Sequence, residues 1–290
     1  RFARLLGQDW AQRTLEPEAW ERLRDLSDKE LWDAHQAQKQ RLLRQVRARL
    51  RELEARHGEA PDELRRVGEI GDADRLTLVF ARRFAAYKRV GLLLSDVDRL
   101  QRLLAHPERP IQIVFGGKAH PADREGQDLI RRVVHMAKDP RFEGYVAYVE
   151  DYDMELARYL LAGADVWVNM PRPPMEASGT SGMKAAINGV PNLSVLDGWW
   201  LEGFKGSNGW GFGEVTQGDE ADAAALYDLI EHKVAPLYYD RGDDGVPHGW
   251  VAMMKEAMIG AVPFSSTRMV AEYLERLYLR ANGHGSGSAG

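Results

Sequence analysis

The sequence has no cysteine among its 290 residues. This absence excludes a disulfide framework and thiolate metal sites, and it is typical of proteins in a reducing compartment. We therefore predict a cytoplasmic location. Long apolar runs are also missing, because no stretch approaches the roughly 18 residues of a membrane span. The first residues, Arg1-Phe2-Ala3-Arg4, do not resemble a signal peptide. No membrane partner is expected.

A large excess of one charge sign is missing too. Lysine and arginine number 39 against 44 aspartate and glutamate residues, so the net charge is −5. This balance gives no general attraction to nucleic acid. We expect no nucleic-acid partner, and any basic site has to be local. His120 and His135 lack partners at metal-ligand spacing, so no metal site is predicted and both are interpreted as structural or surface residues.

The first 70 residues are predicted to form a helical segment. A long helix begins after the N-cap Ser27, with Glu30 three residues on, and ends at Gly58 and Pro61. Its apolar stripe consists of Leu43, Val46, Leu50 and Leu53. Its arginines could form a nucleic-acid face, but acidic residues interrupt them. We interpret them as the solvated face of an amphipathic helix; they are Arg41, Arg44, Arg47, Arg49 and Arg51.

Residues 71–282 alternate between patterns typical of strands and patterns typical of helices. Short runs rich in β-branched and aromatic residues predict strands at Leu76–Phe80, Ile111–Phe115, Tyr145–Val149, Val166–Val168 and Asn192–Leu196. Helices are predicted at Lys88–Ala105, Asp123–Ala137, Met154–Ala162, Ser181–Asn188, Ala223–Val234, Trp250–Ile259 and Thr267–Tyr278. This alternation predicts an α/β fold with a doubly wound, Rossmann-like parallel sheet. Residues 283–290 are interpreted as the flexible tail of an excised piece.

Charged and glycine-rich segments follow the predicted strands, where ligands bind in such sheets. The first strand leads into Arg82-Arg83 and Lys88, and the second leads into Gly116-Gly117-Lys118. The fourth leads into a loop that runs to Lys184 and begins a helix, so its glycines, hydroxyls and free N–H groups form a natural phosphate cradle. We expect Lys184 on the first turn of that helix. An amine there, partly desolvated and close to other cations, is suited to Schiff-base formation with an aldehyde. The loop by itself is equally compatible with a glycine- and serine-rich helix entry that carries a surface lysine.

Four blocks, in order, resemble the α-glucan (glycogen, starch and maltodextrin) phosphorylases. The segment Glu176–Gly189 resembles the family's pyridoxal-phosphate motif, and Asp197-Gly198 matches its following Asp-Gly. The other matching blocks are Arg82-Arg83 with Tyr87-Lys88-Arg89, Gly116-Gly117-Lys118-Ala119, and Glu150-Asp151-Tyr152. The resemblance runs from about residue 6 to residue 279. Trp199-Trp200 and Asn208-Gly209-Trp210 look more like the shorter microbial branch, and the fold implied is the C-terminal domain of a GT-B glycosyltransferase.

The resemblance also implies a role for each matching residue. Lys184 would form the Schiff base with pyridoxal 5′-phosphate, and the same cofactor would be held by Arg82, Tyr152, Thr180 and Ser181. Arg83 and Lys88 would bind the substrate phosphate. The hydroxyls of the transferred glucosyl unit would be held by Glu176, Ser178 and Gly179. In this family the cofactor works through its phosphate, which exchanges a proton with inorganic phosphate. The implied reaction is retaining phosphorolysis of α-1,4-glucan ends to glucose 1-phosphate.

Some positions depart from the pattern of the longer enzymes of the family. Phe84-Ala85-Ala86 replaces an Ile-His-Glu run, Arg82 replaces a lysine and Gly182 an asparagine. Asp153 stands in place of an arginine, which puts the outer cofactor contacts in doubt. The family's first half has no match here, and it supplies glucan-binding residues and much of the dimer contact. We expect the full enzyme to be a homodimer and the chain without its N-terminal half to be inactive.

Two other functions stay open from the residues. A glycogen-synthase-type glucosyltransferase shares the architecture but uses a nucleotide sugar and does not need Lys184 to hold an aldehyde. A non-catalytic module would bind phosphate, cofactor or a partner chain without turnover. A lone Glu176 would more often be a capping or solvated residue, and only the surrounding motif favours a catalytic role. Trp199, Trp200 and Trp210 could stack on sugar rings, but packing is their predicted role.

Overall fold

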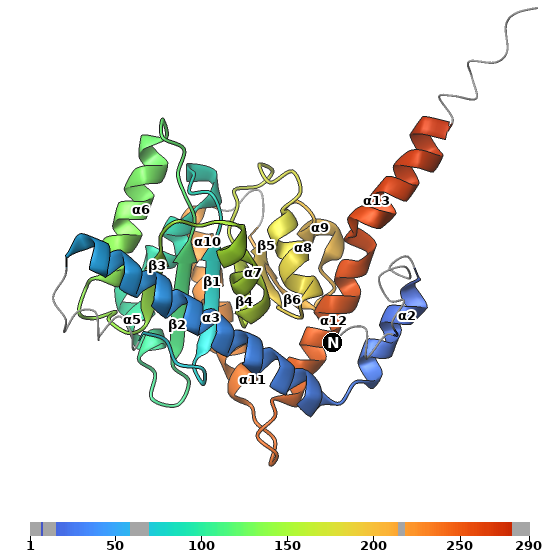
Figure 1. The fold of residues 1–290 in the computed structure, drawn as a ribbon, viewed down its shortest axis with the longest axis horizontal. Helices are drawn as coiled ribbons and strands as arrows, with labels where there is room; N and C mark the ends of the chain where they lie inside the picture. Colours follow the sequence, from blue (N-terminus) through green and yellow to red (C-terminus); the bar gives the residue numbers. More distant parts are fainter. Residues whose placement is uncertain (1–6, 8–15, 59–69, 214–217, 280–290) are drawn as a thin grey trace, which may run out of the picture.

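A six-stranded parallel sheet forms the centre of the molecule (Figure 1). The computed structural model describes residue 7 and residues 16–58, 70–213 and 218–279. Its strands lie in the order β3-β2-β1-β4-β5-β6, which is the order of a doubly wound, Rossmann-like sheet. Their bounds are β1 Leu76–Ala81, β2 Ile111–Gly116, β3 Val146–Val149, β4 Val166–Asn169, β5 Asn192–Val195 and β6 Gly209–Phe212. The predicted fold class is therefore confirmed.

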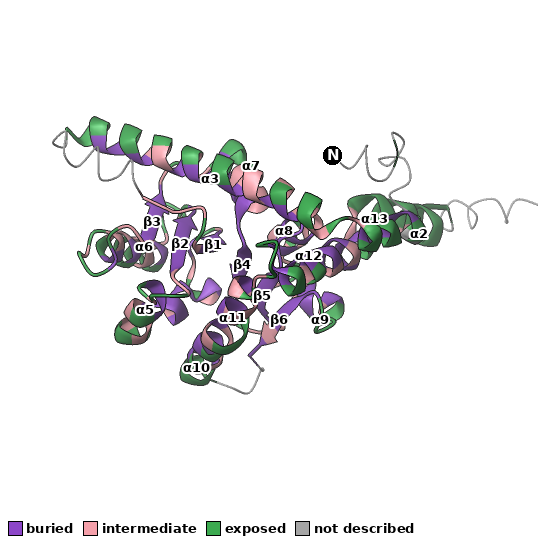
Figure 2. Ribbon diagram, turned by 90° about the horizontal axis from the view of Figure 1, so that it is seen from below, coloured by how far each residue is buried: buried purple, intermediate pink, exposed green. Residues whose placement is uncertain are grey.

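Helices cover both faces of this sheet, as Figure 2 shows. On one face lie α3 (Asp28–His57), α7 (Met154–Gly163) and α8 (Thr180–Ile187). On the other lie α5 (Val97–Leu104), α6 (Arg124–Ala137), α10 (Asp219–Leu229) and α11 (Ala235–Tyr239). Leu78 and Phe80 of β1 face the second group, and Val79 and Ala81 face the first. Burial on both faces explains why the strands are apolar throughout.

The remaining elements lie near the chain ends and between these layers. At the N-terminal side are α2 (Pro17–Glu21) and the 3-10 helix η1 (Arg22–Asp25). Two more 3-10 helices, η2 (Ala86–Lys88) and η3 (Val90–Leu94), follow β1. The others are α9 (Trp200–Gly203), η4 (Ile230–Val234), α12 (His248–Ala261), η5 (Val262–Phe264), α13 (Ser266–Tyr273) and η6 (Leu274–Tyr278). None of the described helices is long and apolar enough to cross a membrane.

Helix α3 follows the sequence prediction at both ends. The Ser27 hydroxyl accepts from the Glu30 backbone N–H at 3.4 Å, and Gly58 caps the other end with a φ of 74°. The second proposed terminator, Pro61, is outside the described residues. The predicted stripe is buried and packs on the sheet and α7. Since α3 shares this core, the division between residues 70 and 71 stays a prediction, and the proposed tail 283–290 lies outside the described part.

The arginines of α3 divide into two groups. Arg41, Arg44 and Arg51 are exposed, as predicted for a solvated face. Arg47 is different, because it donates to the carbonyls of Ile70 at 2.9 Å and Gly71 at 2.5 Å. Arg49 pairs with Asp153 at 2.8 Å. These two attach α3 to the loops at the two ends of the sheet rather than only facing water.

A buried ion-pair network joins α3 to the sheet. The Lys39 ammonium is fully buried and contacts Asp165 at 2.5 Å, the Tyr238 hydroxyl at 2.8 Å and the Arg75 carbonyl at 2.5 Å. Asp165 also contacts His35 at 2.7 Å. Burial works against both charges, but each partner favours the charged form of the other, so the pKa of Lys39 is raised and that of Asp165 is lowered.

Several elements differ from the sequence prediction, which also lacked the short helices α9 and α11. The predicted helix at residues 88–105 is wrong at its start, where Arg89 has a φ of 47° and separates η2 from η3; an α-helix begins only after the N-cap Asp96. Strand β6 was not predicted. Its Gly-Trp-Gly-Phe sequence resembles a turn, yet residues 209–212 pair in register with residues 192–195 of β5.

Candidate active site

The predicted site lies at the carboxyl ends of β1 and β4. In this strand order the direction of winding changes between these two neighbours, and ligands bind in the crevice at that point. The segment after β1 carries Arg82, Arg83 and Lys88, and the segment after β4 carries Glu176 and Gly179 before α8 begins. The fold therefore brings together two segments that are about ninety residues apart, as the pairing of Lys88 with Glu176 shows.

Arg82, Lys88 and Glu176 form one ion cluster. Oε2 of Glu176 accepts from the Arg82 guanidinium at 3.0 Å and from the Lys88 ammonium. All three side chains are nearly buried, with exposed fractions of 8%, 7% and 12%. Two cations thus face one carboxylate at a poorly solvated position. The cluster keeps a net positive charge that suits a further anion.

Two donors of Arg82 support this conclusion independently. Its Nε and Nη1 atoms are buried and have no hydrogen-bond partner among the described residues. Burial lowers the pKa of Arg82 below its ordinary value, although the Glu176 charge opposes this. The guanidinium nevertheless stays protonated, because arginine does not lose its proton in proteins. Buried charged donors of this kind normally have partners, so these two atoms are available to an anionic group.

Arg83 and Lys88 approach each other through Tyr87. The Arg83 guanidinium donates to the Tyr87 hydroxyl at 3.4 Å, and the Lys88 ammonium lies 4.4 Å from the ring centroid. Burial acts against ionisation of Tyr87, but hydrogen bonds with Lys88 and Arg83 lower its pKa below the ordinary value. Arg83 itself is exposed. The structure thus places both proposed phosphate ligands next to Tyr87, Arg83 at its hydroxyl and Lys88 over its ring, although the sequence assigned this residue no role.

Tyr152 lies within the electrostatic influence of Arg82. Burial raises the pKa of its hydroxyl, and the positive charge of Arg82 opposes that increase. A Cβ atom added at Gly116, which ends β2, would come within 3.4 Å of the Tyr152 ring. The glycine therefore lets the ring lie close to the strand end. Tyr152 and Arg82 are near enough for the charge of one to influence the other, and a shared cofactor site stays a prediction.

The loop before α8 is shaped by two glycines. Gly179 has a φ of 83° and is the residue from which α8 starts; a Cβ atom there would lie 3.5 Å from Cγ of Glu176. A Cβ at Gly182 would lie 2.5 Å from Oδ1 of Asn192 and 2.6 Å from Nε1 of Trp199. Both positions need glycine in this packing, one for its backbone conformation and one for space. Gly179 and Gly182 thus let the loop pack closely, and the predicted phosphate cradle stays a prediction.

Asp197 fixes this loop from the neighbouring strand. Its carboxylate accepts from the Glu176 backbone N–H at 2.9 Å and from that of Gly198 at 2.9 Å. The Trp199 backbone N–H donates to the Ser178 carbonyl at 2.7 Å. The Asp-Gly pair was noted in the sequence only as part of a motif. Its physical role is to hold the segment 176–178 against the end of β5.

The remaining predicted cofactor residues are less closely connected. Lys184 lies in the last turn of α8 rather than the first, and its side chain is exposed, so the expected partial burial is not found. Ser178 and Thr180 are exposed as well. The Ser181 hydroxyl accepts from Nε1 of Trp167 at 3.3 Å. Among the described contacts none joins Lys184 to the cluster of Arg82, Lys88 and Glu176, and its role stays a prediction.

Other side chains singled out in the sequence have structural positions. Asp153 caps α7, accepting from the Leu156 backbone N–H at 2.8 Å, and pairs with Arg49, so it serves the scaffold. The predicted packing role of the tryptophans is confirmed. Trp199 and Trp200 are buried with their rings 4.9 Å apart, and Trp210 is also buried. In the described part of the chain, no group of His, Asp and Glu is arranged to hold a metal ion.

Comparison with known proteins decides the family. The model of the carbohydrate phosphorylase family matches residues 4–207. The chain belongs to the carbohydrate phosphorylase family. It is 47% identical over 281 residues to a glycogen phosphorylase of Aquifex aeolicus, covering 96% of this chain and 41% of that protein. It is 42% identical over 286 residues to a maltodextrin phosphorylase of Thermococcus litoralis, covering 96% of this chain and 33% of that protein.

These matches confirm the resemblance seen in the sequence. A third relative, a glycogen phosphorylase of Mycobacterium tuberculosis, is 42% identical over 273 residues, 92% of this chain and 32% of its own length. The chain therefore spans well under half the length of these carbohydrate phosphorylases. The four motif blocks lie within the matched region, and they stand at the carboxyl ends of β1, β2, β3 and β4 in turn.

Proposed function

We propose that this chain is the cofactor- and phosphate-binding half of an α-1,4-glucan phosphorylase, which releases glucose 1-phosphate from glucan ends by retaining phosphorolysis. The observation that carries the proposal is the arrangement of Arg82, Lys88 and Glu176, with two buried Arg82 donors lacking partners among the described residues. Names of the relatives support the substrate class, since they are glycogen and maltodextrin phosphorylases. A cytoplasmic location remains a prediction.

The residues around Arg82 fit the phosphate group of pyridoxal 5′-phosphate. The unpartnered Nε and Nη1 atoms of Arg82 suit a phosphate, the glycine at 179 begins a helix beside it, and Tyr152 borders the same guanidinium. Thr180 and Ser181 stand in the first turn of α8 and would add hydroxyls, and Lys184 would hold the aldehyde end. When bound, the cofactor supplies a phosphate group that can exchange a proton with inorganic phosphate.

The protein's own residues would do the rest. Arg83 and Lys88 bind inorganic phosphate, and with Arg82 they offset the repulsion between two phosphates held close together. Hydroxyls of the glucosyl unit form hydrogen bonds with Glu176, Ser178 and Gly179. In the described structure, Glu176 is bound by both cations. Its carboxylate therefore sets the position of Arg82 and Lys88 while presenting its remaining oxygen to the sugar.

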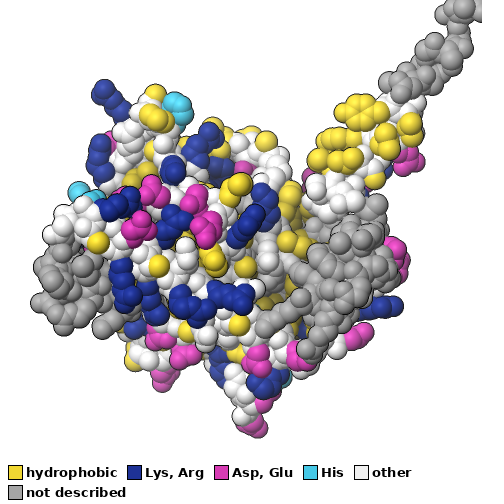
Figure 3. Space-filling view, in the orientation of Figure 1, with side chains coloured by type: hydrophobic (Ala, Val, Ile, Leu, Met, Phe, Trp, Pro, Cys, Tyr) yellow, Lys and Arg dark blue, Asp and Glu magenta, His cyan; other side chains and the backbone are white. Residues whose placement is uncertain are grey.

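We also propose that the missing N-terminal half of the enzyme is a physical partner of this one. Helix α13 and η6 project from the body and carry exposed apolar side chains (Figures 1 and 3). Among them Leu274, Leu277 and Tyr278 are 51%, 58% and 62% exposed. Exposed apolar side chains grouped on one element often mark a surface that contacts another protein segment. A homodimer of the full enzyme remains a prediction.

The experiment that tests this function is complementation. Release of glucose 1-phosphate from maltodextrin and inorganic phosphate is measured for this chain alone and with an added N-terminal half, both with pyridoxal 5′-phosphate. We expect turnover only with both halves, and we expect Leu274→Ser with Leu277→Ser to weaken their association. Substantial turnover by this chain alone would contradict the proposal that the N-terminal half is required. No turnover by the assembled halves would contradict the proposed activity.

A further inference from the structure

Arg89 ends the Tyr87-Lys88-Arg89 motif, and no role has been given to it so far. It lies between η2 and η3, with φ and ψ angles of 47° and 40°. That left-handed conformation is unfavourable for a residue with a side chain and persists only where surrounding contacts enforce it. Arg89 is also 5% exposed. A buried arginine with such a backbone indicates a specific structural demand at this position.

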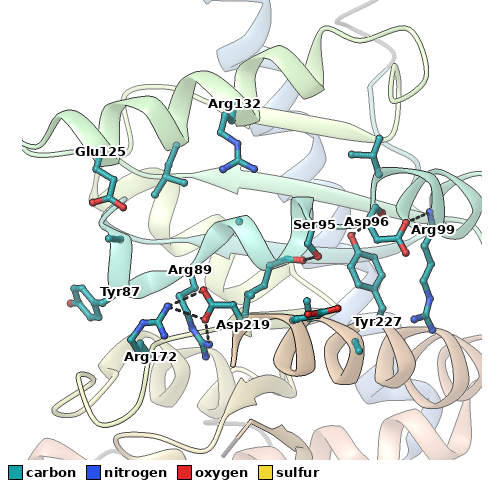
Figure 4. Close-up of a pocket in the computed structure, with 18 of the residues that line it drawn as sticks. Tyr87, Arg89, Ser95, Asp96, Arg99, Glu125, Arg132, Arg172, Asp219 and Tyr227 are labelled. Carbon is teal, nitrogen blue, oxygen red and sulfur yellow. Dashed lines mark hydrogen bonds and ion pairs between the residues drawn. The ribbon is translucent and has the colours of Figure 1, made fainter. Parts of the chain in front are cut away.

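The guanidinium of Arg89 contacts two other segments. Nε donates to the Met170 carbonyl at 3.0 Å, and Nη2 donates to the Pro171 carbonyl at 2.8 Å. Nη1 donates to Asp222 at 2.6 Å and to Asp219 at 3.0 Å, both at the start of α10. Figure 4 shows this side chain beside Asp219 and Arg172 in the wall of a cavity of about 1260 Å³. A planar, forked cation can make these bonds together, whereas a lysine cannot.

These bonds connect the two halves of the candidate site. Arg89 directly follows Lys88, and Met170 and Pro171 begin the segment that leads to Glu176. A backbone bond supports the same connection, because the Arg172 N–H donates to the Tyr87 carbonyl at 2.7 Å. Arg172 in turn pairs with Asp219 at 2.8 Å. We call residues 82–89 the Lys88 loop and residues 170–179 the Glu176 loop. The distance between these two loops is therefore fixed by contacts that lie outside the ion cluster itself.

We infer that Arg89 is a positioning residue, anchored by Asp222 and Asp219, that holds the Lys88 loop and the Glu176 loop at the spacing needed to bind inorganic phosphate. Arg89 makes no described contact with Arg82, Lys88 or Glu176, so it acts through the two loops rather than on the ligand. The inference rests on the proposed function, because it assigns Lys88 to the substrate phosphate.

Arg99 provides a matched comparison. It too is an arginine forked between two carboxylates, with Asp228 at 2.6 Å and Glu231 at 2.7 Å, and it lines the same cavity. However, it joins α5 to α10 and η4 and contacts neither loop of the site. A purely stabilising role for such bridges predicts similar effects of substitution at both positions. A positioning role predicts an effect on phosphate binding at Arg89 only.

The test compares Arg89→Lys with Arg99→Lys in the 290-residue chain. Each variant is loaded with pyridoxal 5′-phosphate, titrated with inorganic phosphate and followed by ³¹P NMR, and its thermal unfolding is recorded. We expect Arg89→Lys to weaken phosphate binding by about tenfold, because a small displacement of a charged ligand group has effects of this order or larger. Arg99→Lys should leave phosphate affinity within about twofold, a change worth less than one RT.

A milder variant covers the case in which Arg89→Lys does not fold. Asp219 is half exposed, and Asp219→Asn loses charge opposite Arg89 and Arg172 while keeping an oxygen acceptor. It should weaken phosphate binding in the same direction by a smaller factor. Wild-type affinity in a folded Arg89→Lys or in Asp219→Asn, or an equal loss in Arg99→Lys, would overturn the inference. A wild-type chain that binds no pyridoxal 5′-phosphate would remove the proposed function and this inference together.

Discussion

Replacement of Arg82 by methionine separates folding from cofactor binding. Arg82 makes one described hydrogen bond to Glu176 and leaves two buried donors without a partner. Loss of a hydrogen bond to a charged group costs about 1.5–3 kcal/mol, and removal of unsatisfied buried donors returns about 1–3 kcal/mol. The two contributions oppose each other. We therefore expect the free energy of unfolding without cofactor to change by less than about 2 kcal/mol.

Cofactor affinity should respond much more strongly. If both free donors of Arg82 bind the phosphate of pyridoxal 5′-phosphate, Arg82→Met loses two charge-assisted hydrogen bonds. At about 1.5 kcal/mol each, the loss is about 3 kcal/mol. Because each 1.4 kcal/mol is tenfold in affinity, the dissociation constant should rise about 100-fold.

The assay is an absorbance titration with pyridoxal 5′-phosphate beside urea unfolding of the free chain. Arg49→Met is the control, because Arg49 is a partly buried arginine that pairs with Asp153 outside the site. It should lose about 1 kcal/mol of stability or less and keep wild-type affinity. Two results would refute the reasoning about the buried donors. One is wild-type affinity in Arg82→Met, and the other is an equal loss of affinity in Arg49→Met.

Three further predictions concern the scaffold. Lys39→Met leaves the buried Asp165 without its ammonium partner and should lower the free energy of unfolding by about 3–5 kcal/mol in urea; a change below about 1 kcal/mol would contradict the network. Gly179→Ala introduces a side chain at a φ of 83° and should cost about 1–2 kcal/mol, measured the same way. Hydrogen bonding to Asp28, with Asp244 nearby, raises the pKa of His248 despite a desolvation effect in the opposite direction. Its contribution to stability should be complete below about pH 6.5 and be lost as pH rises through the raised pKa. A stability difference between wild type and His248→Gln that does not shrink as pH passes the raised pKa would contradict this prediction.

Local patterns in the sequence predicted most of the fold. Five strands and the helix between Ser27 and Gly58 form where their apolar patterns predicted them. Strand β6 was missed because its stability comes from pairing with β5 rather than from β-branched residues. The helix after β1 was misplaced because Arg89 adopts a left-handed conformation enforced by distant groups, Met170, Pro171 and Asp222. Neither the pairing of β6 with β5 nor the contacts of Arg89 can be predicted from residues that are adjacent in the sequence.

The candidate site was predictable to a similar degree. Strand ends and motif residues located Arg82, Lys88 and Glu176 in one crevice, and the structure joins them. The roles of Asp197 and Tyr87 could not be found locally, because each depends on a partner positioned by the fold. Asp153 raised doubt as a departure from the motif. In the structure it is a helix cap paired with α3, so the substitution concerns the scaffold.

The central claim is that Lys184 holds pyridoxal 5′-phosphate beside the cationic crevice of Arg82 and Lys88. The most direct measurement is incubation of the chain with the cofactor, borohydride reduction and peptide mapping of the modified lysine. We expect one dominant label, at Lys184, with much less at exposed lysines such as Lys118. An unlabelled Lys184 under these conditions, or labelling spread evenly over the surface lysines, would contradict it.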